Sequence, residues 1–441
     1  MIVLANIQKL YDGSGAEPSA VSRGVDVHLE GSLIKEVRPH DPNLPASNPD
    51  RDFRVIDLSG KTVTPGLIDC HGHVTLFGLQ EDDIVKAGGP DSVIYAEKIL
   101  TRTLIDGGVT TMRDVGGATH ALKRMVDDGL IRGPRLKISI CMLSTTGGHA
   151  DFRGPDRCHA ELSKLWPPAP GRPSSIVDGA VECRKRVREI KACGADLIKV
   201  CSSPGVASPG DELEHREFTQ EELTAICDEA AARGMKVAAH AHSASGIELG
   251  IACGVHDIQH MSFMDDRLVE QAHEKGCTVT PTSWIIDELI RMGGLDPFVM
   301  EKAKQVAEVH ARAVEYARKG GLPILMGTDP VLTGMHGRNW MELVHLVRDG
   351  LSPLQAWYGS TGLAAAEIGQ DDTGVIAPGR RADLLVCDGD VIDDPGAFAR
   401  GCMLEVIQDG IGQRRGLDGL PQASFEDTTR ALLGELPPSV H

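Results

Sequence analysis

Two histidines end the sequence TPGLIDCHGH, residues 64–73, with a single glycine between them. Side chains two positions apart on a strand point to the same face, so His71 and His73 should aim together where the apolar run ends. Paired imidazoles suit one metal ion, although a polar loop after a strand would explain the same residues. The motif alone leaves both interpretations open, and further ligands elsewhere in the chain must decide between them.

Other short apolar runs also contain, or end with, residues that can bind metals. They are Lys199 in DLIKVCSSP, His240 and His242 in KVAAHAHS, His260 in VHDIQHM and Asp329 in PILMGTD. A lone histidine is more often an ordinary core or loop residue. Chance does not readily place such residues in five separate runs, so the sequence predicts a metal site.

Two choices between neighbouring histidines stay open at this point. His240 and His242 have equal parity, so either could face the metal. His256 and His260 lie four residues apart, roughly 13 Å along an extended chain, so both cannot bind one site. His260 is nearer the end of its run, and we predict it as the ligand.

Lys199 stands between Ile198 and Val200 in an otherwise apolar run. A lysine is almost never fully buried without a partner, and low-dielectric surroundings lower its pKa and make the neutral amine accessible. A structural ion pair with an acidic neighbour, or a side chain that reaches solvent, is the alternative.

These residues need a scaffold that brings the ends of several strands together. Between residues 63 and 370, helical patterns such as TQEELTAICDEAAARG separate eight short runs: GLIDCHGH, VTTMRDVGG, RLKISICML, DLIKVCSSP, KVAAHAHS, VHDIQHM, CTVTPTS and PILMGTD. This alternation predicts an α/β fold, a (β/α)8 TIM barrel, whose chemistry lies at the C-terminal ends of its strands. Residues 1–62 and 371–441 alternate like short strands, and we expect them to form one small β-sandwich domain built from both termini.

Composition narrows the class of protein. The chain has 441 residues, 41% of them hydrophobic, and a net charge of −18, which argues against nucleic acid and anionic membranes as partners. Its 11 cysteines are dispersed, as in a reduced cytosolic protein. Neither a signal peptide nor an apolar run of membrane-spanning length is found, so a cytoplasmic location is expected.

Nearly the whole chain resembles the amidohydrolase superfamily. The motifs that carry the resemblance are GLIDCHGH, IKV, AAHAHS, DIQHM, GTDPVLTGMHG and TGVIAPGRRADLLVCDGD. The chain is similar to the branch of imidazolonepropionase-like hydrolases that contains Xaa-Pro dipeptidases, carboxypeptidase-like enzymes and ochratoxin-type amidases.

The resemblance implies two divalent metal ions, with zinc expected, and a lysine that CO2 converts to a bridging carbamate. It assigns the metals to His71, His73, Lys199, His240, His260 and Asp329. Mononuclear relatives lack the bridging lysine, so Lys199 favours two metals. The resemblance also favours His240 over His242 as the ligand, which leaves His242 to reach the substrate.

The implied reaction is hydrolysis of an amide or peptide bond in a dipeptide or N-acyl amino acid. A metal-bridging hydroxide would attack the carbonyl, and Asp329 would take its proton and pass it to the leaving amine. His149 and His336, in loops after the third and eighth runs, are predicted substrate contacts. Such relatives usually form homo-oligomers and act on small molecules.

Two alternatives accompany this prediction. The same metals could cleave a lactone or a phosphotriester, because metal ligands do not identify the bond that is broken. A non-catalytic scaffold that lost its site is the other alternative, and it predicts missing ligands. The substrate and its side chain are not identified by the sequence.

Overall fold

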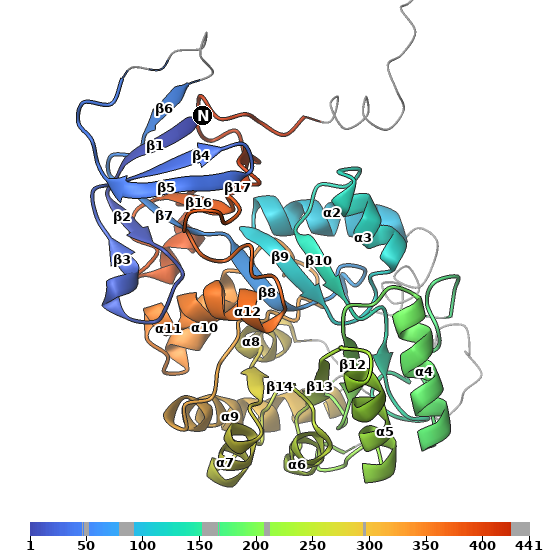
Figure 1. The fold of residues 1–441 in the computed structure, drawn as a ribbon. Coiled ribbons are helices and arrows are strands. Elements are labelled where there is room, and N and C mark those ends of the chain that lie inside the picture. The colour runs from blue at the N-terminus through green and yellow to red at the C-terminus, as the bar shows by residue number, and fades with distance from the viewer. Residues whose placement is uncertain are drawn as a thin grey trace, which may run out of the picture.

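A computed structural model describes residues 1–45, 47, 53–78, 92–151, 166, 168–206, 212–293 and 297–424. Strands from both ends of the chain gather at one end of the molecule, and the middle of the chain supplies the rest (Figure 1). The terminal elements are β1 (Ile2–Ile7), β2 (Lys9–Tyr11), η1 (Pro18–Ala20), β3 (Val21–Ser22), β4 (Val25–Glu30), β5 (Leu33–Pro39), β6 (Arg54–Asp57), β7 (Lys61–Pro65), β16 (Leu384–Asp388), η3 (Pro395–Arg400), β17 (Met403–Gln408) and β18 (Ile411–Gly412).

The middle of the chain alternates strands with helices. Its strands are β8 (Leu67–Gly72), β9 (Val109–Asp114), β10 (Arg135–Ile138), β11 (Met142–Leu143), β12 (Ile198–Cys201), β13 (Val237–Ala241), β14 (Asp257–His260) and β15 (Thr278–Thr280). Its helices are α2 (Ser92–Ile105), α3 (His120–Asp127), α4 (Ala180–Ala192), α5 (Gln220–Ala231), α6 (Ala244–Cys253), α7 (Asp266–Glu274), α8 (Ser283–Met292), α9 (Pro297–Lys319), α10 (Met341–Arg348), α11 (Pro353–Gly359) and α12 (Gly362–Glu367).

Strands from the two ends of the chain pair directly with each other. β16 runs antiparallel to β7 within a six-stranded sheet of order β18-β17-β16-β7-β2-β3. A second sheet has the order β5-β4-β1-β6. Leu4 and Val27 of this second sheet share one buried hydrophobic cluster with Val63 and Leu384 of the first. The two terminal segments therefore bury apolar surface together.

The middle strands form parallel sheets of order β10-β9-β8 and β11-β12-β13-β14-β15. β8 and β9 are buried on both faces, as expected for parallel strands that helices cover. A segment after α9 links the two sheets, since Leu325 N donates to Val279 O at 2.8 Å and Cys70 N donates to Met326 O at 2.9 Å. Because parallel strands run the same way, their carboxyl ends meet at one rim.

Two of the eight predicted strands differ from expectation. The run 135–143 is divided into β10 and β11, because Ile140 between them has a left-handed backbone with φ 71°. The run 323–329 has only an isolated bridge, between Ile324 and Val279, and begins with a proline that lacks a backbone N–H. The other six runs each contain a parallel strand. Within the described ranges, no helix has both the length and the apolar character needed to cross a lipid bilayer.

Candidate metal centre

The predicted ligands converge at one pocket. The predicted residues that line it are His71, His73, His149, Lys199, His240, His242, His260 and Asp329. Four of them lie in strands: His71 in β8, Lys199 in β12, His240 in β13 and His260 in β14. His73 and His242 directly follow β8 and β13, His149 follows β11, and Asp329 lies in the segment after α9. The folded chain thus brings together every residue that the sequence assigned to a metal.

Asp329 lies between the two histidines of the HGH motif. Its Oδ1 is 3.5 Å from His71 Nε2 and 3.4 Å from His73 Nε2. His71, His260 and Asp329 each offer one ligand atom, and these atoms all lie within 4.8 Å of one another. Two imidazoles and a carboxylate at this separation are suited to one divalent ion.

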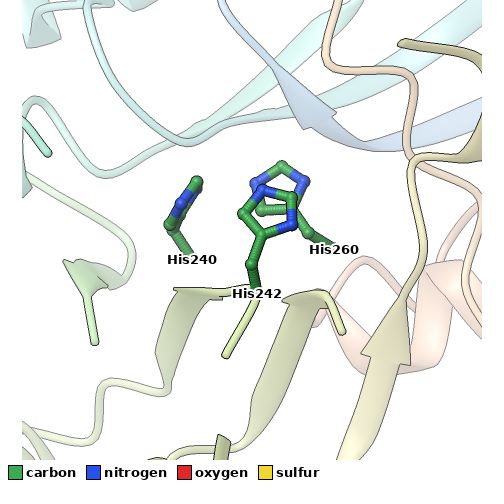
Figure 2. A group of neighbouring side chains, drawn as sticks. All are labelled: His240, His242 and His260. Carbon is green, nitrogen blue, oxygen red and sulfur yellow. The ribbon is translucent and has the colours of Figure 1, made fainter. Parts of the chain in front are cut away.

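A second group consists of His240, His242 and His260 (Figure 2). Their ligand atoms also lie within 4.8 Å of one another. The His242 ring stacks on the His260 ring at 4.7 Å, and the His240 ring meets His260 at 4.4 Å, edge on. Both candidates from the end of β13 therefore face the pocket, as their equal parity predicts, and this geometry alone does not choose between them.

Hydrogen bonds to the other ring nitrogens orient three of these imidazoles. His73 Nδ1 lies 3.0 Å from Gly116 O, and His260 Nδ1 lies 2.8 Å from Thr282 Oγ1. His240 Nε2 lies 3.3 Å from Pro204 O. In each ring one nitrogen is thereby held and the opposite one is left for a ligand, which is the usual arrangement around a protein-bound metal.

His71 carries an unsatisfied polar atom. Its Nδ1 is buried and has no hydrogen-bond partner among the described residues. Burial of a polar atom without a partner costs free energy, so such an atom requires an explanation. A metal ion bound at His71 Nε2, the nitrogen beside Asp329, would leave Nδ1 unsatisfied, so this atom does not itself indicate a metal. The donor set fits divalent metals because imidazoles and a carboxylate converge in one buried pocket.

Burial also sets the protonation of the histidines that line the pocket. It lowers the pKa of His71, His240 and His260 well below the ordinary value, so these rings are neutral and can donate a lone pair. Burial by itself would also lower the pKa of His73, but the hydrogen bond and charge of Asp329 outweigh this effect and raise that pKa.

Lys199 is 1% exposed in the floor of the pocket. Its Nζ donates to the side-chain carbonyl of Gln259, whose Nε2 donates to Asp257 Oδ2 at 2.9 Å. Burial lowers the pKa of Lys199 to about 8. A substantial fraction of the amine is therefore neutral near that pH, which is the form that reacts with CO2.

A buried ion pair supports the strands below this floor. The Arg113 guanidinium contacts the Asp257 carboxylate, and Arg113 Nε donates to Cys70 O at 2.7 Å. Asp114 accepts backbone hydrogen bonds from the segments around it, including one from Val74 N at 2.8 Å. Arg113 and Asp114 thus serve the structure.

We expect Arg113→Met to destabilise the fold by about 3–5 kcal/mol, because it leaves the Asp257 carboxylate buried without its cation. Arg102→Met is the matched control, since Arg102 and Asp106 form an exposed pair at 3.5 Å that should contribute about 0–1 kcal/mol. Urea unfolding measures both free energies. Equal losses in the two variants would contradict a supporting role for the buried pair.

The other predicted contacts occupy different places. The His149 ring stacks on His240 at 4.1 Å, within the pocket. His336 is buried with Nε2 2.6 Å from Leu76 O, and it is not among the described residues that line the pocket. His256 precedes β14, at the opposite end of that strand from His260.

Several residues of the site were not predicted from the sequence. Trp166 stacks on His73 at 5.5 Å and donates to Thr75 Oγ1 at 2.9 Å. Thr282 holds His260 from a left-handed backbone with φ 55°, which is a rare conformation for a β-branched residue. Thr282 lies within the seventh run, two residues after β15 ends, so a search of every strand end would have found it. Trp166 stands in a proline-rich loop and gives no such signal.

Comparisons with known proteins identify the family of this chain. Residues 62–426 match the Amidohydrolase family. An ochratoxinase from Aspergillus niger is 32% identical over 350 residues, which cover 76% of this chain and 72% of that protein.

Solved structures of similar sequence also superpose on this chain. A prolidase complexed with N-methylphosphonate-L-proline superposes with a TM-score of 0.82 and 32% identity, covering 94% of this chain and 99% of that one. A Xaa-Pro dipeptidase with methionine in its active site has a TM-score of 0.80 and 30% identity over the same shares of the two chains.

Proposed function

This chain belongs to the amidohydrolase family, and from that premise we propose that it is a binuclear metal-dependent hydrolase of amide or peptide bonds. The substrate class is a dipeptide or an N-acyl amino acid, with ochratoxin-type amides included. The observation that carries the proposal is the position of Asp329 Oδ1, within 3.5 Å of both HGH imidazoles, in a pocket that also contains Lys199, His240 and His260. The alternative of a scaffold that lost its site is set aside, because the relatives with matching sequences are named as hydrolases.

The residues that would hold two divalent ions are His71, His73, Lys199, His240, His260 and Asp329. Zinc is the first candidate, because a borderline metal suits imidazole and carboxylate together. When bound, two such ions lower the pKa of a water molecule and polarise the scissile carbonyl.

Lys199 contributes as a carbamate. Its neutral Nζ attacks the carbon of CO2, forms an N–C bond and releases one proton, so that a buried amine becomes an anion with two oxygen donors. The lowered pKa of Lys199 favours this reaction, since only the unprotonated amine is nucleophilic.

Asp329 moves the proton. Its carboxylate accepts a proton from the attacking water and returns it to the nitrogen of the leaving amine. His242 lies on the same rim with Nδ1 held 2.9 Å from Ser262 Oγ, which leaves Nε2 to contact substrate. His149 is proposed as a second contact, and His336 as a residue that positions the loop at Leu76.

We also propose how the chain is divided. Residues 63–370 form the barrel, which the hydrogen bonds around 324–329 would close, and residues 1–62 with 371–441 form the composite β-sandwich. Residues 46, 48–52 and 425–441 of that second unit lie outside the described ranges.

A hydrolysis screen tests the proposed function. Zinc-loaded protein is assayed with dipeptides, N-acyl amino acids, lactones and phosphotriesters. Turnover confined to the first two groups is expected, whereas preferential cleavage of a lactone or phosphotriester would overturn the assignment to amides.

His71→Ala should remove about one of the two metals and lower kcat/KM at least roughly 100-fold, because a direct ligand matters more than the outer-shell residues whose loss costs about 10–100-fold. The control is His273→Ala, whose side chain is exposed on α7. Elemental analysis and kinetics of the same samples measure both effects. Unchanged metal content in folded His71→Ala would contradict the ligand assignment.

A further inference from the structure

A chain of buried hydrogen bonds leads from the first residue of α8 to the pocket. The Ser283 hydroxyl lies 3.1 Å from His310 Nε2 of α9, and His310 Nδ1 lies 3.2 Å from Ser262 Oγ. Ser262 Oγ lies 2.9 Å from His242 Nδ1, so the chain reaches a ring that lines the pocket. None of these four residues is more than 4% exposed.

The hydroxyl of Ser283 fixes the direction of this hydrogen-bond chain. Within the described part of the protein, its one hydrogen-bond partner is His310 Nε2. A buried hydroxyl proton needs an acceptor, so Ser283 donates and His310 Nε2 accepts. Ser283 N donates to Glu342 Oε1 at 2.8 Å, which holds the residue in place. The chain therefore starts with a donor at Ser283.

His310 passes this direction on to Ser262. Burial lowers the pKa of His310 to about 4, so the ring is neutral and carries a single proton. Because Nε2 accepts from Ser283, that proton is on Nδ1 and is donated to Ser262 Oγ. Among the described residues, the two imidazoles are the only hydrogen-bond partners of this hydroxyl, so its own proton is donated to His242 Nδ1.

His242 is thereby left with its proton on Nε2, since Nδ1 accepts. His240, the other candidate ligand from the end of β13, is held differently. Its Nε2 lies 3.3 Å from Pro204 O, and a carbonyl oxygen only accepts, so the free lone pair of His240 is on Nδ1. His240 can therefore offer a lone pair to a metal, whereas His242 offers a proton.

We propose that His310 and Ser262 are positioning residues that hold His242 in the tautomer with Nε2 protonated, so that this nitrogen donates a hydrogen bond to an oxygen of the substrate. The inference deepens the proposed amidase function and rests on it. Both residues act through His242, because neither is among the described residues that line the pocket. A donor that is fixed beforehand needs no rearrangement when negative charge develops on that oxygen.

The positions of two protons test the chain directly. Zinc-loaded protein labelled with nitrogen-15 histidine is studied by NMR, and the two rings are assigned by the loss of their resonances in His310→Leu and His242→Ala. We expect the proton of His310 on Nδ1 and that of His242 on Nε2. Neutron diffraction from crystals of the zinc-loaded protein locates the same protons without any variant. A proton on His310 Nε2 or on His242 Nδ1 would overturn the proposal.

Kinetics measure what the chain contributes. Ser262→Ala should lower kcat/KM about tenfold or more for the amide that the screen above identifies, up to the roughly 10²–10³-fold that loss of one transition-state donor costs. His310→Leu should have a smaller effect, because the Ser262 hydroxyl can still donate but is no longer directed. Both variants should retain their metals in elemental analysis. Arg312→Leu is the matched control, since Arg312 is exposed two residues further along α9.

The same two substitutions are then repeated in His242→Ala protein. A residue that acts through His242 has no effect once that ring is absent, so each substitution should change kcat/KM there by less than about twofold. A residue that merely supports the fold would cost the same in both backgrounds. Equal losses with and without His242 would therefore overturn the positioning role.

These measurements separate failure of this inference from failure of the proposed function. The expected protons on His310 and His242, in protein that hydrolyses no amide, would retain the hydrogen-bond chain and refute the amidase. Amide hydrolysis by protein whose His310 carries its proton on Nε2 would retain the amidase and overturn the chain.

Discussion

Asp329→Asn should lower kcat by at least about two orders of magnitude while the fold and the metals remain. Asn preserves the size of the side chain and one ligand oxygen, but it cannot accept a proton and return it. General acid–base assistance of this kind contributes typically about 10²–10⁴ in rate. The backbone should tolerate the change, because Asp329 has a left-handed φ of 47°, a conformation that Asn adopts more readily than most residues.

The measurement combines steady-state kinetics with elemental analysis on the same protein. Asp128→Asn is the control, since Asp128 caps the exposed end of α3. If Asp329→Asn retained both metals and its kcat stayed within a factor of a few of wild type, the proton would travel through another group. His242 would then be the first residue to test, because its ring lies on the same rim.

Lys199→Ala should abolish most activity, because the variant lacks the anion that we propose to bridge the two metals. Metal-ion catalysis contributes several kcal/mol, so we expect a loss on the order of 10³-fold or more. Short carboxylates such as formate or acetate should restore part of it by entering the space that the side chain leaves. The matched control is Lys185→Ala, whose side chain is 74% exposed on α4.

The carbamate itself can be observed directly. Enzyme incubated with carbon-13-labelled bicarbonate should show a carbamate resonance that Lys199→Ala lacks. The labelling rate should fall as the pH drops below about 8, because the amine becomes protonated there. A plain amine at Lys199 in active, metal-loaded enzyme would refute the carbamate.

The convergence of the candidate ligands could be predicted because strand geometry is simple. His71 and His73 have the same parity, and parallel strands deliver their last residues to one rim, so His240 and His260 arrive at the same pocket. The pairing of β7 with β16 likewise agrees with the alternation at the two ends of the chain.

Other features depend on tertiary structure and could not be derived from the sequence. Ile140 divides the third run through its left-handed backbone, which no propensity of isoleucine indicates. His149 follows β11 and His336 follows the run 323–329, and of these two described residues His149 alone lines the pocket, whereas His336 bonds to Leu76 O. Loop residues are positioned by their contacts, whereas strand residues are positioned by periodicity.

The metal content of the folded protein tests the central claim most directly. Protein that has been saturated with zinc in the presence of bicarbonate and then freed of excess metal is analysed by mass spectrometry of the elements, with its folding checked by circular dichroism. A binuclear centre predicts about two equivalents of metal per chain. One equivalent or none in fully folded, metal-replete protein would contradict the binuclear centre.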